Sequence, residues 1–294
     1  MERFLFVFFA ALAACNANAI SARQGSFNTY HLYTSQNIRI PTAIPPTEAA
    51  IRVSDINPNL KTVIVVHGHG GSMGTSLNPL VKDALLTRED VNVIVVDWSV
   101  FASQSYSNAV TAVPSVGTFL AGFISQAVIA EKVSLATLHL VGFDLGAHVV
   151  GFAGRVLNGN VARITGLNPS DSQWGSNSQR LSISDARYVE VIHTDSGLMF
   201  SNGIHDAIGH VDFYVNGGNN QPGCFYNNGC SHNRSWEVFA ASLTHDHLIG
   251  NLCGTWLQIS LNTCRSFTLP MGTNDLEKIG SGMYRVNTGR TYPY

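Results

Sequence analysis

The chain has 294 residues, of which 45% are hydrophobic and only 12% are charged, about half the usual ~25%. So few charges exclude a disordered chain, and the formal net charge of −2 leaves no basic excess for nucleic-acid binding. This composition is typical of one large globular domain or two ordinary ones.

Residues 1–19 have the pattern of a secretory signal peptide. The apolar run Phe4–Ala14 is too short to span a bilayer, and Ala17-Asn18-Ala19 fits a cleavage site. We therefore expect a secreted, extracellular protein whose mature chain is 20–294. No later stretch is expected to be long and apolar enough to cross a membrane.

Four apolar runs predict the strands of a sheet, in the order Lys61–Val66, Val91–Val96, Leu138–Gly142 and Tyr188–His193. Continuous apolar runs without alternation are typical of strands that are buried on both faces of a parallel sheet. Helix-length stretches lie between them, at Ser76–Thr87, Val116–Val133 and Ala147–Leu157. This alternation predicts an α/β fold, in which ligands bind at the carboxyl ends of the strands.

The third run leads into Gly142-Phe143-Asp144-Leu145-Gly146, and a helix is expected to follow. A G-x-x-x-G segment between strand and helix has the shape of a nucleophile elbow, because two glycines permit a turn that lifts the central side chain. The central residue is usually Ser, but here it is Asp144. The N-terminus of the following helix favours its negative charge.

The order and spacing of the motifs resemble the pancreatic lipase family over nearly all of 20–294. The segments that carry this resemblance are Tyr30–Thr34, Val63–Ser72, Val93–Ser99, Val141–Val149, Gly166–Pro169, Val189–Gly197, Gly209–Cys224 and Cys230–Arg234. The resemblance implies a single α/β-hydrolase domain over 20–294 with a mostly parallel central sheet. We expect it to lack the C-terminal β-sandwich domain that some members have.

The resemblance also implies a catalytic triad in which two members are replaced. Asp144 stands at the nucleophile position and Asn168 at the acid position, and only His232 is retained as the base. The backbone N–H groups of His69 and Leu145 match the oxyanion hole. We expect these N–H groups and a protonated His232 to hold Asp144, so that the protein's own anion fills the hole.

Three hypotheses of function follow. The first is a catalytically inactive relative that binds lipid, sterol, another apolar ligand or a protein partner, with peripheral contact to lipid surfaces; non-enzymatic yolk proteins of the family are a precedent. The second is a weak or unconventional lipid ester hydrolase of the triglyceride lipase or phospholipase A1 type. The third makes Asp144 a nucleophile of the dehalogenase or epoxide hydrolase kind, with Asp195 as a substitute acid; Leu145, however, stands where dehalogenases carry Trp.

Four cysteines follow the signal segment and allow three disulfide pairings. Secretion favours disulfides, and the simplest pairing is sequential: Cys224–Cys230 and Cys253–Cys264. By resemblance, the first pair encloses a short lid, Phe225–Gly229, as in phospholipase A1-like members with an open cleft. Phe200–Gly218 would form the neighbouring apolar wall.

One glycosylation sequon, Asn233-Arg234-Ser235, directly follows His232, and we expect Asn233 to be too buried for modification. No cofactor motif is found. Two histidine pairs lack partners at zinc-site spacing, so structural roles are expected for His67/His69 and His245/His247.

Overall fold

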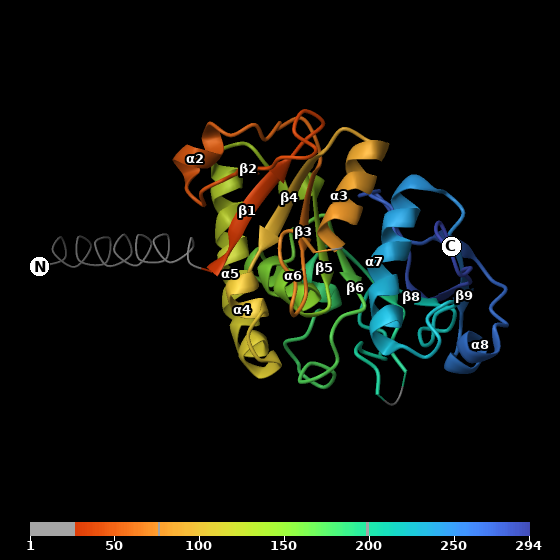
Figure 1. Ribbon diagram of the computed structural model, residues 1–294. Helices are drawn as coiled ribbons and strands as arrows, with labels where there is room; N and C mark the ends of the chain where they lie inside the picture. Colours follow the sequence, from red (N-terminus) through yellow and green to blue (C-terminus); the bar gives the residue numbers. More distant parts are fainter. Residues whose placement is uncertain (1–26, 76, 198–199) are drawn as a thin grey trace, which may run out of the picture.

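The computed structural model describes residues 27–75, 77–197 and 200–294, so the signal segment lies outside the described residues (Figure 1). The strands are β1 (Thr29–Tyr33), β2 (Thr42–Ala43), β3 (Thr62–Val66), β4 (Asn92–Asp97), β5 (Leu138–Phe143), β6 (Arg163–Leu167), β7 (Tyr188–His193), β8 (Val211–Val215), β9 (Ile249–Cys253), β10 (Thr268–Pro270) and β11 (Gly282–Val286). The helices are α2 (Glu48–Arg52), α3 (Leu77–Arg88), α4 (Ser99–Ala102), α5 (Tyr106–Ile129), α6 (Leu145–Val156), α7 (Asn228–Thr244) and α8 (Trp256–Leu261), with 3₁₀ turns η1 (Leu135–Thr137) and η2 (Ile183–Asp185).

The described strands form one sheet in the order β10-β9-β11-β8-β7-β6-β5-β3-β4-β1-β2. Every neighbouring pair from β4 to β11 is parallel, whereas β1 with β4 and β9 with β11 are antiparallel. β3 and β5 are adjacent although β4 lies between them in sequence, and Val66 is paired with Gly142. The loops after β3, β5, β6 and β7 therefore leave the same edge side by side. This is the α/β-hydrolase fold.

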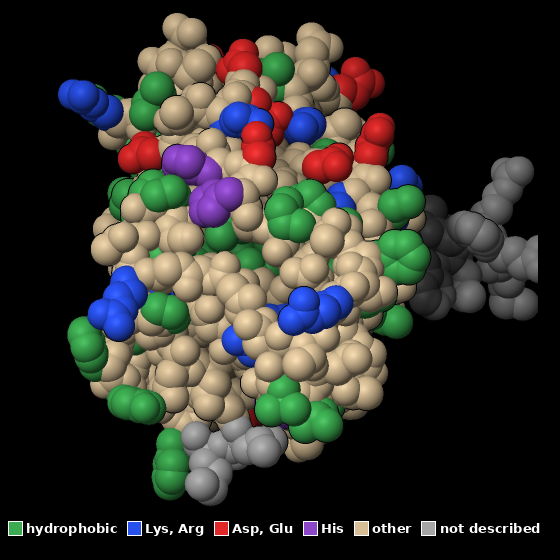
Figure 2. Space-filling model, turned by 90° about the vertical axis from the view of Figure 1, so that its right-hand side faces the viewer, with side chains coloured by type: hydrophobic (Ala, Val, Ile, Leu, Met, Phe, Trp, Pro, Cys, Tyr) green, Lys and Arg blue, Asp and Glu red, His purple; other side chains and the backbone are tan. Residues whose placement is uncertain are grey.

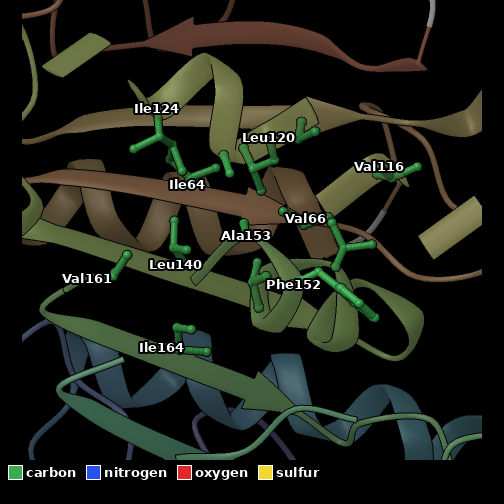
Figure 3. Close-up of a cluster of buried hydrophobic side chains, with 14 of the residues drawn as sticks. Ile64, Val66, Val116, Leu120, Ile124, Leu140, Phe152, Ala153, Val161 and Ile164 are labelled. Carbon is green, nitrogen blue, oxygen red and sulfur yellow. The ribbon is translucent and has the colours of Figure 1, made fainter. Parts of the chain in front are cut away.

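Helices cover both faces of the sheet, which explains the continuous apolar runs. Along β3, Ile64 and Val66 belong to a buried cluster with α5 and α6, whereas Val63 and Val65 belong to a second cluster with α3 and α7. Figure 3 shows part of the first cluster, in which side chains of α5 and α6 meet those of β3, β5 and β6. Because both faces are buried, consecutive residues of these strands are apolar.

The four predicted strands correspond to β3, β4, β5 and β7, with each end within one residue of its prediction. The predicted helices near α3 and α6 are also present. α5 begins ten residues before the prediction, because the Ser105 side chain caps it by accepting from the Asn108 N–H at 3.4 Å, and Pro114 lies inside the helix.

α5 corrects the expectation that no later stretch is long and apolar enough to cross a membrane. Its 24 residues meet that criterion by length and composition. In the fold, α5 packs on α6, and Val113, Leu120 and Ile124 are buried in the first cluster. Packing within the fold therefore accounts for its apolar composition.

The face that carries α7 and α8 has hydrophobic side chains in separate patches between polar atoms (Figure 2). Leu257, Leu261 and Phe267 are exposed. Scattered apolar side chains of this kind are normal on a protein surface.

The close crossing of β5 and α6 gives a test of the fold. A Cβ on Gly142 would lie 2.7 Å from Ala147 Cα, so Gly142→Ala should lower the free energy of unfolding by about 2–3 kcal/mol. Gly74→Ala is the matched control, because no described atom lies within 4 Å of its added Cβ. Urea denaturation measures both, and equal losses would contradict the prediction.

Candidate functional site

Asp144 lies on a tight turn between β5 and α6, with φ 54° and ψ −120°. A non-glycine residue holds such a conformation only when its surroundings impose it. Gly142 and Gly146 allow the turn, since a Cβ on Gly146 would lie 2.5 Å from the His67 carbonyl oxygen. The turn places the Asp144 side chain at the carboxyl edge of the sheet and at the N-terminus of α6.

The Asp144 carboxylate is held by backbone N–H groups from two segments. The His69 N–H, in the loop after β3, donates to Oδ2 at 2.8 Å, and the Leu145 N–H donates from the first turn of α6. Gly68 leaves room for this contact, because a Cβ there would lie 2.6 Å from Oδ2. Burial raises the pKa of the Asp144 carboxyl, but the hydrogen bond and the charge interaction with His232, together with the hydrogen bonds from the two backbone N–H groups, lower it to about 2. The carboxylate is therefore ionised near neutral pH.

Asn168 is fully buried just after β6, and its amide has a fixed orientation. Oδ1 accepts from the backbone N–H groups of Thr194 at 2.9 Å and Asp195 at 3.0 Å. Because only the amide oxygen can accept, Nδ2 must be the atom that lies 2.6 Å from Nδ1 of His232. Nδ2 is a donor, so Nδ1 of His232 accepts and the ring proton lies on Nε2.

His232, on α7, directs this Nε2–H toward Asp144, with 3.4 Å between Nε2 and Oδ1. The Asn168 amide opposes the expected protonation of His232, because a second proton on Nδ1 would face the Asn168 amide hydrogens; the charge of the ring stays a prediction. In a hydrolytic triad the acid accepts from Nδ1–H, and Nε2 accepts from the nucleophile. Here the hydrogen bonds run the other way, from Asn168 through His232 to Asp144.

The carboxylate of Asp195 makes no hydrogen bond to His232 among the described residues, contrary to the substitute-acid hypothesis. Its Oδ2 accepts from the N–H and Nδ2 of Asn202, at 3.0 and 2.6 Å. The backbone of Asp195 acts on the site instead, since its N–H donates to Asn168 and its carbonyl oxygen accepts from Asn168 Nδ2 at 3.3 Å.

A cleft of about 370 Å³ opens over Asp144 and His232. Tyr106 and Phe143 line it; Phe143 lies in the elbow motif, whereas no motif in the sequence identified Tyr106. The Tyr106 hydroxyl hydrogen-bonds Ser170 Oγ at 2.7 Å and donates to the Ser172 carbonyl oxygen at 2.8 Å. The expected apolar wall from 200–218 is wrong, because the residues that this segment contributes to the cleft are the polar Ser201 and Asn202.

Comparison with known proteins identifies the family. The family model described as Lipase matches residues 12–268. Pancreatic lipase-related protein 2 of Cavia porcellus is 34% identical over 241 residues, which cover 79% of this chain and 55% of that protein. Lipase member H of Oryctolagus cuniculus is 35% identical (82% and 54% covered), and phospholipase A1 member A of Rattus norvegicus is 36% identical (67% and 44% covered). The chain belongs to the pancreatic lipase family.

The chain spans about half the length of the curated relatives it matches. The family match over residues 12–268 covers β1 to β9 and the site segments described above. This similarity makes the chain a lipase-like protein. It does not assign the activity of any one relative to this chain.

Both predicted disulfides of this lipase-family chain are present, with Cα–Cα distances of 5.4 Å for Cys224–Cys230 and 4.8 Å for Cys253–Cys264. The first encloses the short lid segment, in which Phe225 and Tyr226 are 85% and 84% exposed. Neither side chain lines the cleft over Asp144. The lid segment therefore leaves the cleft open.

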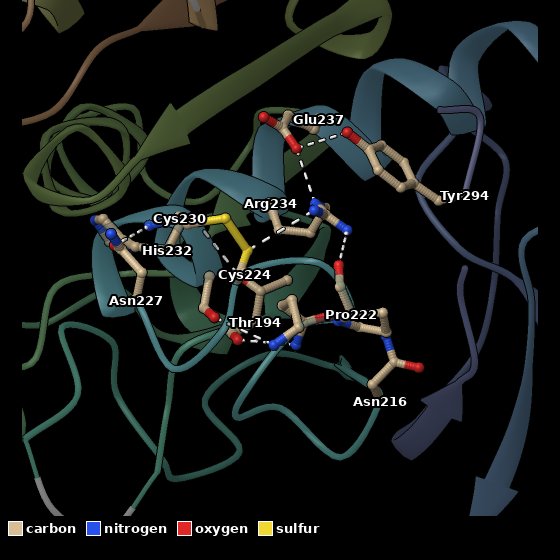
Figure 4. Close-up of a disulfide and its surroundings, with 12 residues drawn as sticks. Thr194, Asn216, Pro222, Cys224, Asn227, Cys230, His232, Arg234, Glu237 and Tyr294 are labelled. Carbon is tan, nitrogen blue, oxygen red and sulfur yellow. Dashed lines mark hydrogen bonds and ion pairs between the residues drawn. A yellow bond between two sulfur atoms is a disulfide. The ribbon is translucent and has the colours of Figure 1, made fainter. Parts of the chain in front are cut away.

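Side chains around the first disulfide join the lid segment to α7 and the C-terminus (Figure 4). Arg234 donates to Glu237 Oε2 at 2.8 Å and to the Pro222 carbonyl oxygen at 3.1 Å. Its guanidinium carbon lies 4.2 Å from the ring centroid of Tyr294, whose hydroxyl donates to Glu237. These contacts hold the start of α7, and with it His232, in place.

Asn233 is exposed and lines the cleft, so the expectation that it is too buried for glycosylation is wrong. Glycosylation there stays a prediction. Within the described ranges, no three His, Cys, Asp or Glu side chains are grouped to hold a metal ion. The ring of His67 stacks on Trp98 and accepts from its backbone N–H at 3.1 Å, which is a structural role.

The ring nitrogens of His232 give a direct test of the hydrogen-bond direction. Nitrogen-15 NMR of the purified protein near neutral pH should find Nδ1 unprotonated and Nε2 protonated. Asn168→Asp should add a proton at Nδ1 and give a doubly protonated ring, because carboxylates then face both ring nitrogens. A doubly protonated ring in the wild-type protein would contradict the assignment.

The charge of Asp144 predicts a pH-dependent stability. Its pKa of about 2 in the fold lies below the ordinary 3.8, so the ionised form stabilises the fold above about pH 4 and this contribution is lost as the pH falls toward 2. The difference corresponds to about 2 kcal/mol, which Asp144→Asn should lose at neutral pH and regain progressively in acid. Urea denaturation from about pH 7 to about pH 3 measures this, with the exposed Asp246→Asn as control. A loss that does not change with pH would exclude the charge as its cause.

Proposed function

We propose that this lipase-family chain is catalytically inactive and binds an apolar or amphiphilic ligand in the cleft. The contact that supports this most directly is the 2.8 Å hydrogen bond from the His69 N–H to Asp144 Oδ2. By resemblance, the N–H groups of His69 and Leu145 are those that would stabilise a substrate oxyanion. A carboxylate of the protein already occupies them, so an ester carbonyl has no free donors at this position.

The state of His232 supports the same proposal. An ester-cleaving serine needs Nε2 as a proton acceptor, whereas here Nε2 carries the proton that faces Asp144. In serine proteases, loss of the serine costs about 10⁶ in turnover and replacement of the acid by Asn about 10⁴. These losses do not add, because the three residues act as a unit.

Asp144 as a nucleophile is disfavoured by the same geometry. An ester formed on its carboxylate would need a water molecule activated by His232 to release the product. Nε2–H cannot accept the proton of that water, and the Asp195 carboxylate is bonded to Asn202 instead of the ring. A weak lipid ester hydrolase remains the alternative that the names of the relatives favour, and an ester assay decides between the two.

We also propose an extracellular location. Two disulfides support it, because such bonds persist in oxidising compartments.

Restoring both replaced residues tests the proposal. The wild-type protein should turn over phospholipid or short-chain esters below ~1 s⁻¹, the low end for ordinary enzymes. The double variant Asp144→Ser with Asn168→Asp should gain measurable esterase activity and react with a serine-directed fluorophosphonate probe. Asp144→Ser alone should recover less, because Asn168 still donates to His232 Nδ1.

The control for this experiment is the double variant with His232→Ala added, which should lose the gained activity. Wild-type turnover above ~1 s⁻¹ would refute catalytic inactivity. A folded double variant that cleaves nothing and binds no probe would mean that more of the catalytic site than the nucleophile and the acid has been lost.

A further inference from the structure

The cleft over Asp144 has a negative charge and no cationic side chain on its described wall. Asp144 is the sole Asp, Glu, Lys or Arg among the described residues that line it. Burial, together with the negative charges of Asp144 and Asp171, raises the pKa of Tyr106 to about 12, although its hydrogen bond with Ser170 acts against the rise. Asp144 thus places a carboxylate on the described wall without a Lys or Arg beside it, whereas an oxyanion is stabilised by donors or positive charge.

The Asp144 carboxylate has acceptor capacity left for a ligand. Its two oxygens offer about four lone-pair positions. The donors already in place are the N–H groups of His69 and Leu145 and Nε2–H of His232. About one position remains for a donor from the cleft, and 10% of the Asp144 side chain is accessible.

Aromatic and polar groups surround this position. Phe143 and Tyr106 line the cleft, and the Phe143 ring centroid lies 4.6 Å from that of His232. Aromatic faces attract an organic cation, most strongly where water is excluded. The polar residues Ser201 and Asn202 line the same cleft.

Ligands whose head group only accepts hydrogen bonds do not fit here. An ester carbonyl or a fatty-acid carboxylate would need the two backbone N–H groups that Asp144 already occupies. An ionised fatty acid would in addition meet the Asp144 charge without a cation to offset it.

We propose that this cleft binds an amphiphile with an ammonium head group, with Asp144 as counter-ion and with Tyr106 and Phe143 as aromatic walls. The inference rests on the proposed function and specifies the head group that the site takes. A neutral alcohol shares the hydrogen-bond donor of such a ligand but lacks its charge.

Calorimetric titration of the full-length secreted protein with three ligands of equal chain length tests the proposal. Octylammonium should bind on the order of tenfold more tightly than octanol, since a hydrogen bond to a charged group is stronger than a neutral one. Octanoate should bind more weakly than either. All three are used below the concentrations at which they aggregate.

Matched variants locate the charge that is responsible. Asp144→Asn should lower octylammonium affinity on the order of tenfold and leave octanol affinity nearly unchanged. Asp246→Asn removes the same charge from an exposed site beyond the end of α7, and the helix from His232 to Thr244 alone spans about 18 Å, so it should change neither affinity. If Asp144→Asn does not fold, the order of the three ligands on the wild-type protein decides alone.

The outcomes separate the two proposals. If none of the octyl ligands binds, both the ligand-binding function and the head-group inference are overturned. If octanol or octanoate binds as tightly as octylammonium, or if Asp144→Asn and Asp246→Asn behave alike, the ammonium inference fails and the ligand-binding function stands.

Discussion

The hydrogen bond from the His69 N–H to the Asp144 carboxylate determines what the site can do. It forms because β3 and β5 are neighbours in the sheet, with Val66 beside Gly142, so the loops after these strands meet. The space for it comes from Gly68, where a Cβ would collide with the carboxylate. A backbone arrangement suited to stabilising a transient oxyanion thus holds a permanent anion of the protein.

The two replaced residues complement each other, because they face opposite nitrogens of the His232 ring. Asn168 presents a donor to Nδ1, which leaves the ring proton on Nε2, and Asp144 presents the acceptor that this proton needs. With Asn168 and a serine at 144, the ring could not take the serine proton. With Asp144 and an aspartate at 168, two carboxylates would need a doubly protonated ring between them. With Asn168 and Asp144, a neutral His232 ring has an amide donor facing Nδ1 and a carboxylate acceptor facing Nε2–H.

Much of the sheet could be predicted from the sequence because burial on both faces requires unbroken apolar runs, as in β3 and β4. β6 and β8 are not among the predicted strands, and each has a buried charge whose partner lies in β7, a strand that the apolar runs did predict. Arg163 in β6 pairs with Glu190 at 3.1 Å, and Asp212 in β8 lies 2.9 Å from His193 Nε2. The sequence does not show what compensates Arg163 or Asp212, since the partner becomes a neighbour only in the folded chain.

The site positions could be predicted from motif order, but the direction of their hydrogen bonds could not. That direction depends on the backbone N–H groups of Thr194 and Asp195, which turn the Asn168 amide so that Nδ2 faces His232. No residue type encodes this, because any residue at those two positions supplies the same N–H groups. The sign of the charge in the cleft follows from the same detail: with His232 neutral, nothing on the described wall offsets Asp144. The proposed preference for a cation therefore depends on the backbone around Asn168 as much as on Asp144 itself.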